Sequence, residues 1–212
     1  MLYGEPPTQG FIRGRVFAHP VLRISFEVPA GYQLFDTQKA VYALGPDAAM
    51  IIFDTEPRPG AFQRRTMLEY LRGAKPPLAQ VATISVTGLE AATGSLIVNT
   101  GSGRVELRLA VIRINPTTIC RFRFLTPVSL LSQLGSGNIR TLQGFRILTV
   151  TEATALKPLR VRVISVQRGD SVVSVAKRMI FEQYAVERFR VLNGLGRATN
   201  LSIGQRVKIV TE

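Results

Sequence analysis

The stretch from residue 104 to 125 constrains the fold of this 212-residue chain more than any other feature of its sequence. Apolar residues alternate with charged ones up to Leu109, and after the turn-like Asn115-Pro116-Thr117 the alternation resumes through Cys120 to Phe124. Two runs of period two around a turn predict an antiparallel β-hairpin with one buried face. The alternation slips near Ala110–Ile112, which predicts a β-bulge there.

The remainder of residues 1–150 also favours β structure, interrupted by two helices. Leu22–Pro29 alternates and stops at proline, as a half-buried strand does. Shorter β-prone runs lie at 32–36, 40–44 and 49–54, helical spacing lies at Phe62–Leu71 and Val128–Leu142, and Phe145–Val150 is a last strand or extended exit. An antiparallel sheet with helices against it predicts an α+β fold of the α/β/α sandwich type.

A second, smaller domain is expected after a linker at 151–158. Within 159–212, Leu159–Val166 alternates as a strand, and a helix begins near Asp170, which is a suitable N-cap. A second helix at about 185–192 ends at Asn193-Gly194, and Arg206–Val210 is the last strand. The predicted order is strand, helix, helix, strand.

The common catalytic arrangements are hard to assemble from these residues. His19 is the only histidine, so no HExxH zinc helix exists in the chain, and its place at a strand end favours a turn or surface role. Cys120 alternates in phase with buried phenylalanines, which favours an inert thiol. Asp54 and Glu56 share one face of a strand end and could act as acid and base or bind a cation, although such pairs are more often only solvated. We assign no catalytic residue, no metal ligand and no cofactor.

The charge is the other unusual feature, with 27 basic and 14 acidic residues. Residues 1–150 hold 16 basic and 9 acidic residues, and residues 151–212 hold 11 and 5. A basic surface is expected on the polar face of the hairpin, formed by Arg104, Arg108, Arg121 and Arg123. Such an excess points to a polyanion, namely nucleic acid, anionic lipid or an acidic envelope polymer. The phenylalanines alternate inward rather than beside the arginines, so nucleic-acid binding is the alternative hypothesis rather than the leading one.

The ends and hydropathy of the chain bear on location. No apolar run approaches the roughly 18 residues needed to cross a bilayer, so no membrane span is expected. The opening Met1–Pro7 has neither a basic nor an apolar signal-peptide region, which predicts a cytoplasmic protein unless the chain is cut from a longer precursor.

The C-terminal segment resembles a LysM module, the βααβ unit that binds glycans containing N-acetylglucosamine, such as peptidoglycan. The matching stretches are Val163–Ser171, Val175–Arg178, Leu192–Leu195 and Leu201–Ile209. The resemblance implies a shallow glycan groove between two loops, formed by Gly169, Asp170, Ser171 and Val172 and by Asn200, Leu201, Ser202 and Ile203. A LysM fold that has lost its glycan site is the alternative.

The whole chain resembles the C-terminal, non-catalytic region of α-proteobacterial envelope zinc metallopeptidases of the HtpX/BepA type. Tyr3–Pro20, Phe26–Tyr32 and the LysM-like end carry the likeness, and the middle domain resembles the PsbP-like sandwich. The resemblance implies a periplasmic binding or targeting region, with peptidoglycan or envelope proteins as partners. It places zinc only in a peptidase domain that this chain lacks, and it makes Met1 an internal start.

Overall fold

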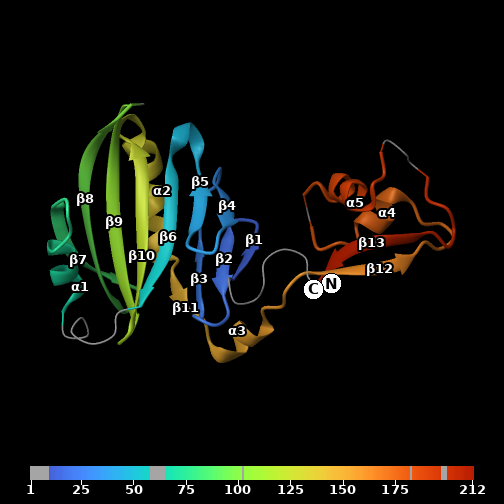
Figure 1. The fold of residues 1–212 in the computed structure, drawn as a ribbon, viewed down its shortest axis with the longest axis horizontal. Helices are drawn as coiled ribbons and strands as arrows, with labels where there is room; N and C mark the ends of the chain where they lie inside the picture. Colours follow the sequence, from blue (N-terminus) through green and yellow to red (C-terminus); the bar gives the residue numbers. More distant parts are fainter. Residues whose placement is uncertain (1–9, 58–64, 102, 182, 197–199) are drawn as a thin grey trace. The chain divides into compact units, whose positions relative to one another are not determined.

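The computed structural model describes residues 10–57, 65–101, 103–181, 183–196 and 200–212, and it divides the chain into two compact units at 154/155 (Figure 1). Of the described residues, those from 10 to 154 belong to the larger unit and those from 155 to 212 to the smaller one. Both units mix helices with antiparallel strands, so the predicted α+β class is confirmed.

A seven-stranded antiparallel sheet dominates the larger unit (Figure 1). In spatial order its strands are β4 (Gln33–Asp36), β5 (Val41–Leu44), β6 (Met50–Pro57), β10 (Thr118–Pro127), β9 (Gly103–Asn115), β8 (Leu89–Thr100) and β7 (Ala79–Val86). The predicted hairpin is the β9–β10 pair. Its irregularity falls at Ile114, where the register passes from Thr118 opposite Asn115 to Ile119 opposite Arg113.

The expected bulge at Ala110–Ile112 is therefore misplaced, and burial on both faces of the sheet explains the misleading pattern. Ala110 and Ile112 belong to the main core on one face, whereas Val111 packs into a separate cluster on the other. Three consecutive buried residues arise because both faces are covered there, not because the strand slips.

A second sheet and one helix cover the first of these faces. The sheet consists of β1 (Phe11–Arg13), β2 (Val16–His19), β3 (Ile24–Glu27) and β11 (Arg146–Ile147), and the helix is α2 (Leu131–Gln143), preceded by the 3-10 turn η3 (Val128–Leu130). The rings of Phe26, Phe53 and Phe122 meet between the sheets, with centroids 4.8–5.0 Å apart. These contacts place the main core between the two sheets.

Helix α1 (Met67–Arg72) covers the opposite face of the large sheet. Its N-cap is Thr66, whose hydroxyl accepts from the Glu69 N–H at 3.2 Å while the Glu69 carboxylate accepts from the Thr66 N–H at 2.8 Å. These hydrogen bonds lower the pKa of Glu69. The helix expected at Phe62–Leu71 thus starts later, because Thr66 provides a capping box; residues 58–64, including Arg64, lie outside the described part.

The segment expected as a final strand and a linker contains a third helix. β11 ends at Ile147, and α3 (Val150–Ala155) follows, extending into the expected linker at 151–158. Thr149 and Glu152 form the reciprocal hydrogen bonds of a capping box at its start, and Ala153 is buried.

The smaller unit has the predicted order of strand, two helices and strand. β12 (Arg160–Ser165) pairs antiparallel with β13 (Arg206–Thr211), and α4 (Val172–Ala176) and α5 (Ala185–Asn193) lie between them in the chain. Val175, Phe189 and Val207 are fully buried at the centre of a core separate from that of the larger unit. The N-cap of α4 is Ser171 rather than the expected Asp170.

Candidate functional site

Two loops of the smaller unit come together where the strand pair ends. The Val166 N–H donates to the Gln205 carbonyl at 2.9 Å, and the Gly204 N–H donates to the Val166 carbonyl at 2.8 Å. These two bonds extend the pairing of β12 and β13 by one step beyond Ser165 and Arg206. The structure therefore joins the loop after β12 to the loop before β13, the two loops between which the LysM resemblance implies a glycan groove.

The first loop is organised by its own side chains. Gly169 has a φ of +88°, a conformation that favours glycine. The Asp170 carboxylate accepts from the Gln167 N–H at 2.8 Å and forms an ion pair with Arg178. Since its side chain is only 7% exposed, Asp170 shapes the loop, and it is poorly placed to contact a ligand directly.

Because the Asp170 carboxylate is engaged by Arg178 and the Gln167 N–H, Ser171 rather than Asp170 is the N-cap of α4. The Ser171 hydroxyl accepts from the Ser174 N–H at 3.1 Å, and the Ser174 hydroxyl accepts from the Ser171 N–H at 2.8 Å. Val172, the next predicted site residue, is buried in the core. Only Gly169 and Ser171 of the four predicted residues in this loop are exposed.

The second loop presents more of its predicted residues to solvent. Asn200 and Ser202 are exposed, and Ile203 is 72% exposed, whereas Leu201 packs against the core. The Ser202 N–H donates to the Gln205 side-chain oxygen at 3.0 Å, which closes the loop into a tight turn. An exposed isoleucine on a closed turn next to the first loop is an apolar contact point for a small ligand group.

Asn193 holds the strand that follows this loop, a role that sequence reasoning missed. Its side-chain amide donates to the carbonyls of Phe189 and Lys208, both at 2.9 Å, and its side-chain oxygen accepts from the Lys208 N–H at 2.6 Å. Gly194 ends α5 with a φ of +63°. The Leu-Asn-Gly sequence was the available signal, but it indicated only a helix end until the strand position was known.

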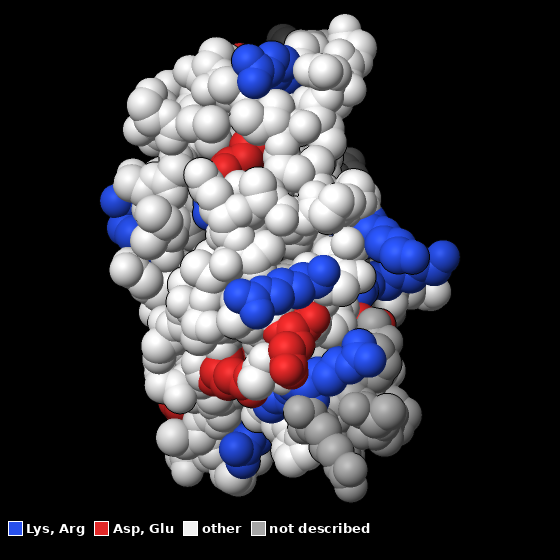
Figure 2. Space-filling view, turned by 90° about the vertical axis from the view of Figure 1, so that its left-hand side faces the viewer, with Lys and Arg blue, Asp and Glu red and all other residues white. Residues whose placement is uncertain are grey.

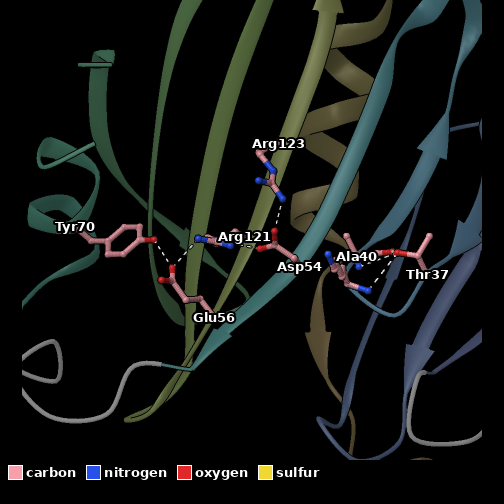
Figure 3. Close-up of polar contacts among 8 residues, drawn as sticks. Thr37, Ala40, Asp54, Glu56, Tyr70, Arg121 and Arg123 are labelled. Carbon is pink, nitrogen blue, oxygen red and sulfur yellow. Dashed lines mark hydrogen bonds and ion pairs between the residues drawn. The ribbon is translucent and has the colours of Figure 1, made fainter. Parts of the chain in front are cut away.

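In the larger unit, the candidate acid pair and half of the candidate basic surface contact one another (Figure 3). Arg121 lies opposite Asp54 in the β6–β10 register and bonds Asp54 at 2.6 Å and Glu56 at 2.7 Å. Arg123 also pairs with Asp54, and the Tyr70 hydroxyl of α1 donates to Glu56 at 2.7 Å. The Asp54 and Glu56 carboxylates therefore serve as ion-pair partners on the sheet.

This arrangement raises the pKa of Arg121. Burial opposes its charged form, but hydrogen bonds within the network and the charges of Asp54 and Glu56 prevail and raise the pKa. Asp54 is 10% exposed in its side chain. The network therefore fixes charge in place, and it offers neither carboxylate as an unengaged acid or base.

The other two candidate arginines of the hairpin lie on the opposite face of the sheet. Arg108 is directly opposite Phe124 in the β9–β10 register, and Arg104 is in phase with Arg108. The prediction that all four share one polar face was wrong, because the register places Leu109, not Arg108, opposite Arg123. Arg108 pairs with Glu106 at 2.8 Å. On the face of the molecule that Figure 2 shows, basic and acidic side chains lie side by side within a largely uncharged surface.

The other two candidate side chains, those of His19 and Cys120, take part in a turn and in the core. The His19 Nδ1 accepts from the Leu22 N–H at 3.2 Å and so ties the turn between β2 and β3. Its ring also borders an open hollow of about 120 Å³ that includes Asp36, Lys39 and Asp54 but not Glu56. Cys120 is fully buried, and burial together with the charge of Asp54 raises its pKa, as expected for an unreactive thiol.

The described residues contain neither a cluster of metal ligands nor a membrane-spanning helix. No three His, Cys, Asp or Glu side chains come together there as metal ligands. None of the helices in that part of the chain has both the length and the apolar composition needed to cross a bilayer.

Comparison with known families identifies the smaller unit. Residues 164–210 match the family model of the LysM domain. No curated protein matches the chain.

The solved structures that resemble the chain in fold include two with TM-scores of 0.50 and 0.51. One is a crystal structure of a protein from Bacteroides thetaiotaomicron, with a TM-score of 0.51 and 9% identity over 79% of this chain and 58% of that protein. The chain thus spans little more than half of that protein's length. The other is cyanobacterial PsbP (CyanoP) from Synechocystis, with a TM-score of 0.50 and 12% identity over 68% of this chain and 98% of that protein. At such identities these likenesses show the fold alone, and they support the PsbP-like architecture predicted for the sandwich.

Proposed function

We propose that the unit at residues 155–212 binds a glycan containing N-acetylglucosamine, such as peptidoglycan. The observation that carries the proposal is the hydrogen-bonded junction of the two loops at Val166, Gly204 and Gln205, within a segment that matches the LysM domain. In this arrangement the loop backbones would pair with acetamido groups, and the exposed Ile203 would contact the acetyl methyl group.

Sedimentation of the full chain with purified peptidoglycan tests this proposal. Ile203→Ser removes the exposed apolar contact from the second loop, and we expect it to weaken binding by about threefold to tenfold, the worth of one buried aliphatic contact. The matched control is Val191→Ser, which removes a β-branched residue that is 83% exposed on α5. Failure of the wild-type chain to sediment with peptidoglycan would refute the proposal, and equal losses in the two variants would move the site elsewhere.

We also propose that the two units together are a non-catalytic targeting region of a periplasmic, zinc metallopeptidase-like protein. The resemblance to the HtpX/BepA-type region supports this, and in such a protein the sandwich would be a second surface for envelope proteins. Zinc and peptidase chemistry would belong to another domain of that protein. We expect three results: an in-frame HExxH helix upstream of Met1, fractionation of the native protein with the periplasm, and no peptidase activity in the chain alone. A native start at Met1 with cytoplasmic fractionation contradicts it.

A further inference from the structure

The open face of the β12–β13 pair carries positive charge. Arg206 and Lys208 are two residues apart on β13, so both project from the face opposite the buried Val207 and Ile209. Their cross-strand neighbours on that face are the exposed Ser165 and Val163, which carry no charge. This face therefore presents ammonium and guanidinium groups beside a small apolar surface.

A third cation lies in the first loop. Arg168 is exposed and stands two residues after Val166, while Arg206 directly follows Gln205. Because Val166 and Gln205 are joined by a backbone hydrogen bond, the junction of the loops has one arginine close to it on each chain segment. Both arginines therefore stand within two residues of the junction across which a ligand would lie.

The carboxylates in the described part of the chain do not pair with these cations. Among the described residues, Arg168, Arg206 and Lys208 form no ion pair. Asp170, the carboxylate in the two loops, faces Arg178 and the Gln167 N–H with its side chain 7% exposed. Glu187 stands on the first turn of α5. The described residues of the two loops therefore include the unpaired Arg168, with the unpaired Arg206 directly after them, and no unpaired carboxylate, which favours anionic ligands there.

We infer that the glycan bound by this unit carries carboxylates: peptidoglycan with its peptides attached is preferred to a neutral polymer of N-acetylglucosamine. The inference rests on the proposed function and adds the charge of the substrate to it. Sugar contacts come from the loops, and the carboxylates of the attached peptides meet Arg168 and Arg206. Exposed ion pairs of this kind change affinity by about twofold to fivefold each.

Binding of the full chain to four probes separates this inference from the proposed function. The probes are intact peptidoglycan, peptidoglycan whose carboxylates have been converted to amides with a carbodiimide and ammonia, chitohexaose and duplex DNA, each measured at 50 mM and 500 mM NaCl. We expect intact peptidoglycan to bind about fivefold to twentyfold more tightly than the amidated glycan at 50 mM, with the difference shrinking at 500 mM because salt screens exposed charges. Equal affinity for intact and amidated glycan overturns the inference but leaves glycan binding intact. No affinity for either glycan overturns the proposed function itself, and DNA binding as tight as that of intact peptidoglycan overturns the carboxylate assignment.

The double variant Arg168→Glu with Arg206→Glu tests the residues named. It should lose the preference for intact peptidoglycan while keeping the affinity of the wild-type chain for chitohexaose, which also reports that the unit is folded. The matched control is Lys39→Glu with Arg140→Glu, which reverses two exposed cations in the larger unit. A control that loses the preference equally would show that only the net charge of the chain is responsible, and the assignment to the loops would fall.

Discussion

Several arginines in the two units differ in whether they form an ion pair. In the larger unit Arg121 and Arg123 lie on the sheet against Asp54 and Glu56, and Arg15, Arg108, Arg113 and Arg146 also have carboxylate partners. In the smaller unit Arg178 pairs with Asp170, while Arg168, Arg206 and Lys208 stand without an ion pair among the described residues. A net charge of +13 therefore covers two kinds of cation: arginines that pair with carboxylates, of which the larger unit has most, and cations beside the loops of the smaller unit that have no ion pair among the described residues.

The difference shows how an excess of arginine should be interpreted. In the larger unit, strand pairing brings opposite charges from distant parts of the sequence, such as Asp54 and Arg121, within 2.6 Å. Such pairs contribute to stability where they are partly buried and offer little to a partner. Basic residues become evidence for an anionic ligand only where the fold leaves them without a carboxylate, as at Arg168 and Arg206.

Removing Asp54 should have the largest effect. Asp54→Ala leaves Arg121 and Arg123 without their shared carboxylate, and we expect the free energy of unfolding to fall by about 2 kcal/mol, since both arginines are about a third exposed. Urea denaturation measures it. Glu27→Ala breaks the more exposed Arg15–Glu27 pair and should cost less than about 0.5 kcal/mol. Equal losses would show that the sheet network contributes no more than a surface ion pair.

Asn193→Ala should have the next largest effect, on the smaller unit. It removes two hydrogen bonds from α5 to the backbone of Lys208 in β13 and one to the Phe189 carbonyl within α5, with an expected loss of about 1.5 kcal/mol. Amide hydrogen exchange should show faster exchange at Lys208 and its neighbours. The exposed Asn200→Ala serves as the control. Unchanged protection of Lys208 would mean that the strand pairing alone positions β13.

Acid should weaken the larger unit through Glu152. Hydrogen bonds from Thr149 and Arg146 lower the pKa of Glu152 to about 2 from its ordinary value of 4.5. Because the folded pKa is the lower one, this stabilisation is complete above pH 4.5 and is lost as the pH falls towards 2. Glu152→Gln should therefore be less stable than the wild type at pH 7 and closer to it at pH 2.5 in parallel urea titrations. A stability difference that stays constant with pH would exclude this linkage.

The smallest change in stability is expected where the effect on binding is largest. Arg168→Glu with Arg206→Glu should alter the free energy of unfolding by less than about 0.5 kcal/mol, because neither side chain has an ion pair to lose among the described residues. Thermal unfolding of the full chain measures this. A loss comparable to that of Asp54→Ala would mean that these cations are structural, and the contrast between the units would disappear.

The elements set by local sequence were predictable. The period-two runs gave the β9–β10 hairpin, and helical spacing with Asn193-Gly194 gave α5 and its end, because side-chain burial and glycine conformation act over a few residues. The loop at Gly169 was likewise located from its neighbours along the chain. Capping was less predictable: Asp170 and Ser171 are both suitable N-caps, and the choice depended on Arg178, one full α4 helix away.

The sequence by itself determined the two-part α+β organisation, the LysM-like loops and the excess of positive charge. Only the tertiary structure decided which charges remain available. The register of β9 against β10 separates Arg108 from Arg123, and the register of β6 against β10 joins Asp54 to Arg121. Register depends on packing across the whole sheet, and a shift by one residue would reverse every face. For that reason no local pattern could tell a structural arginine from one that can meet a ligand.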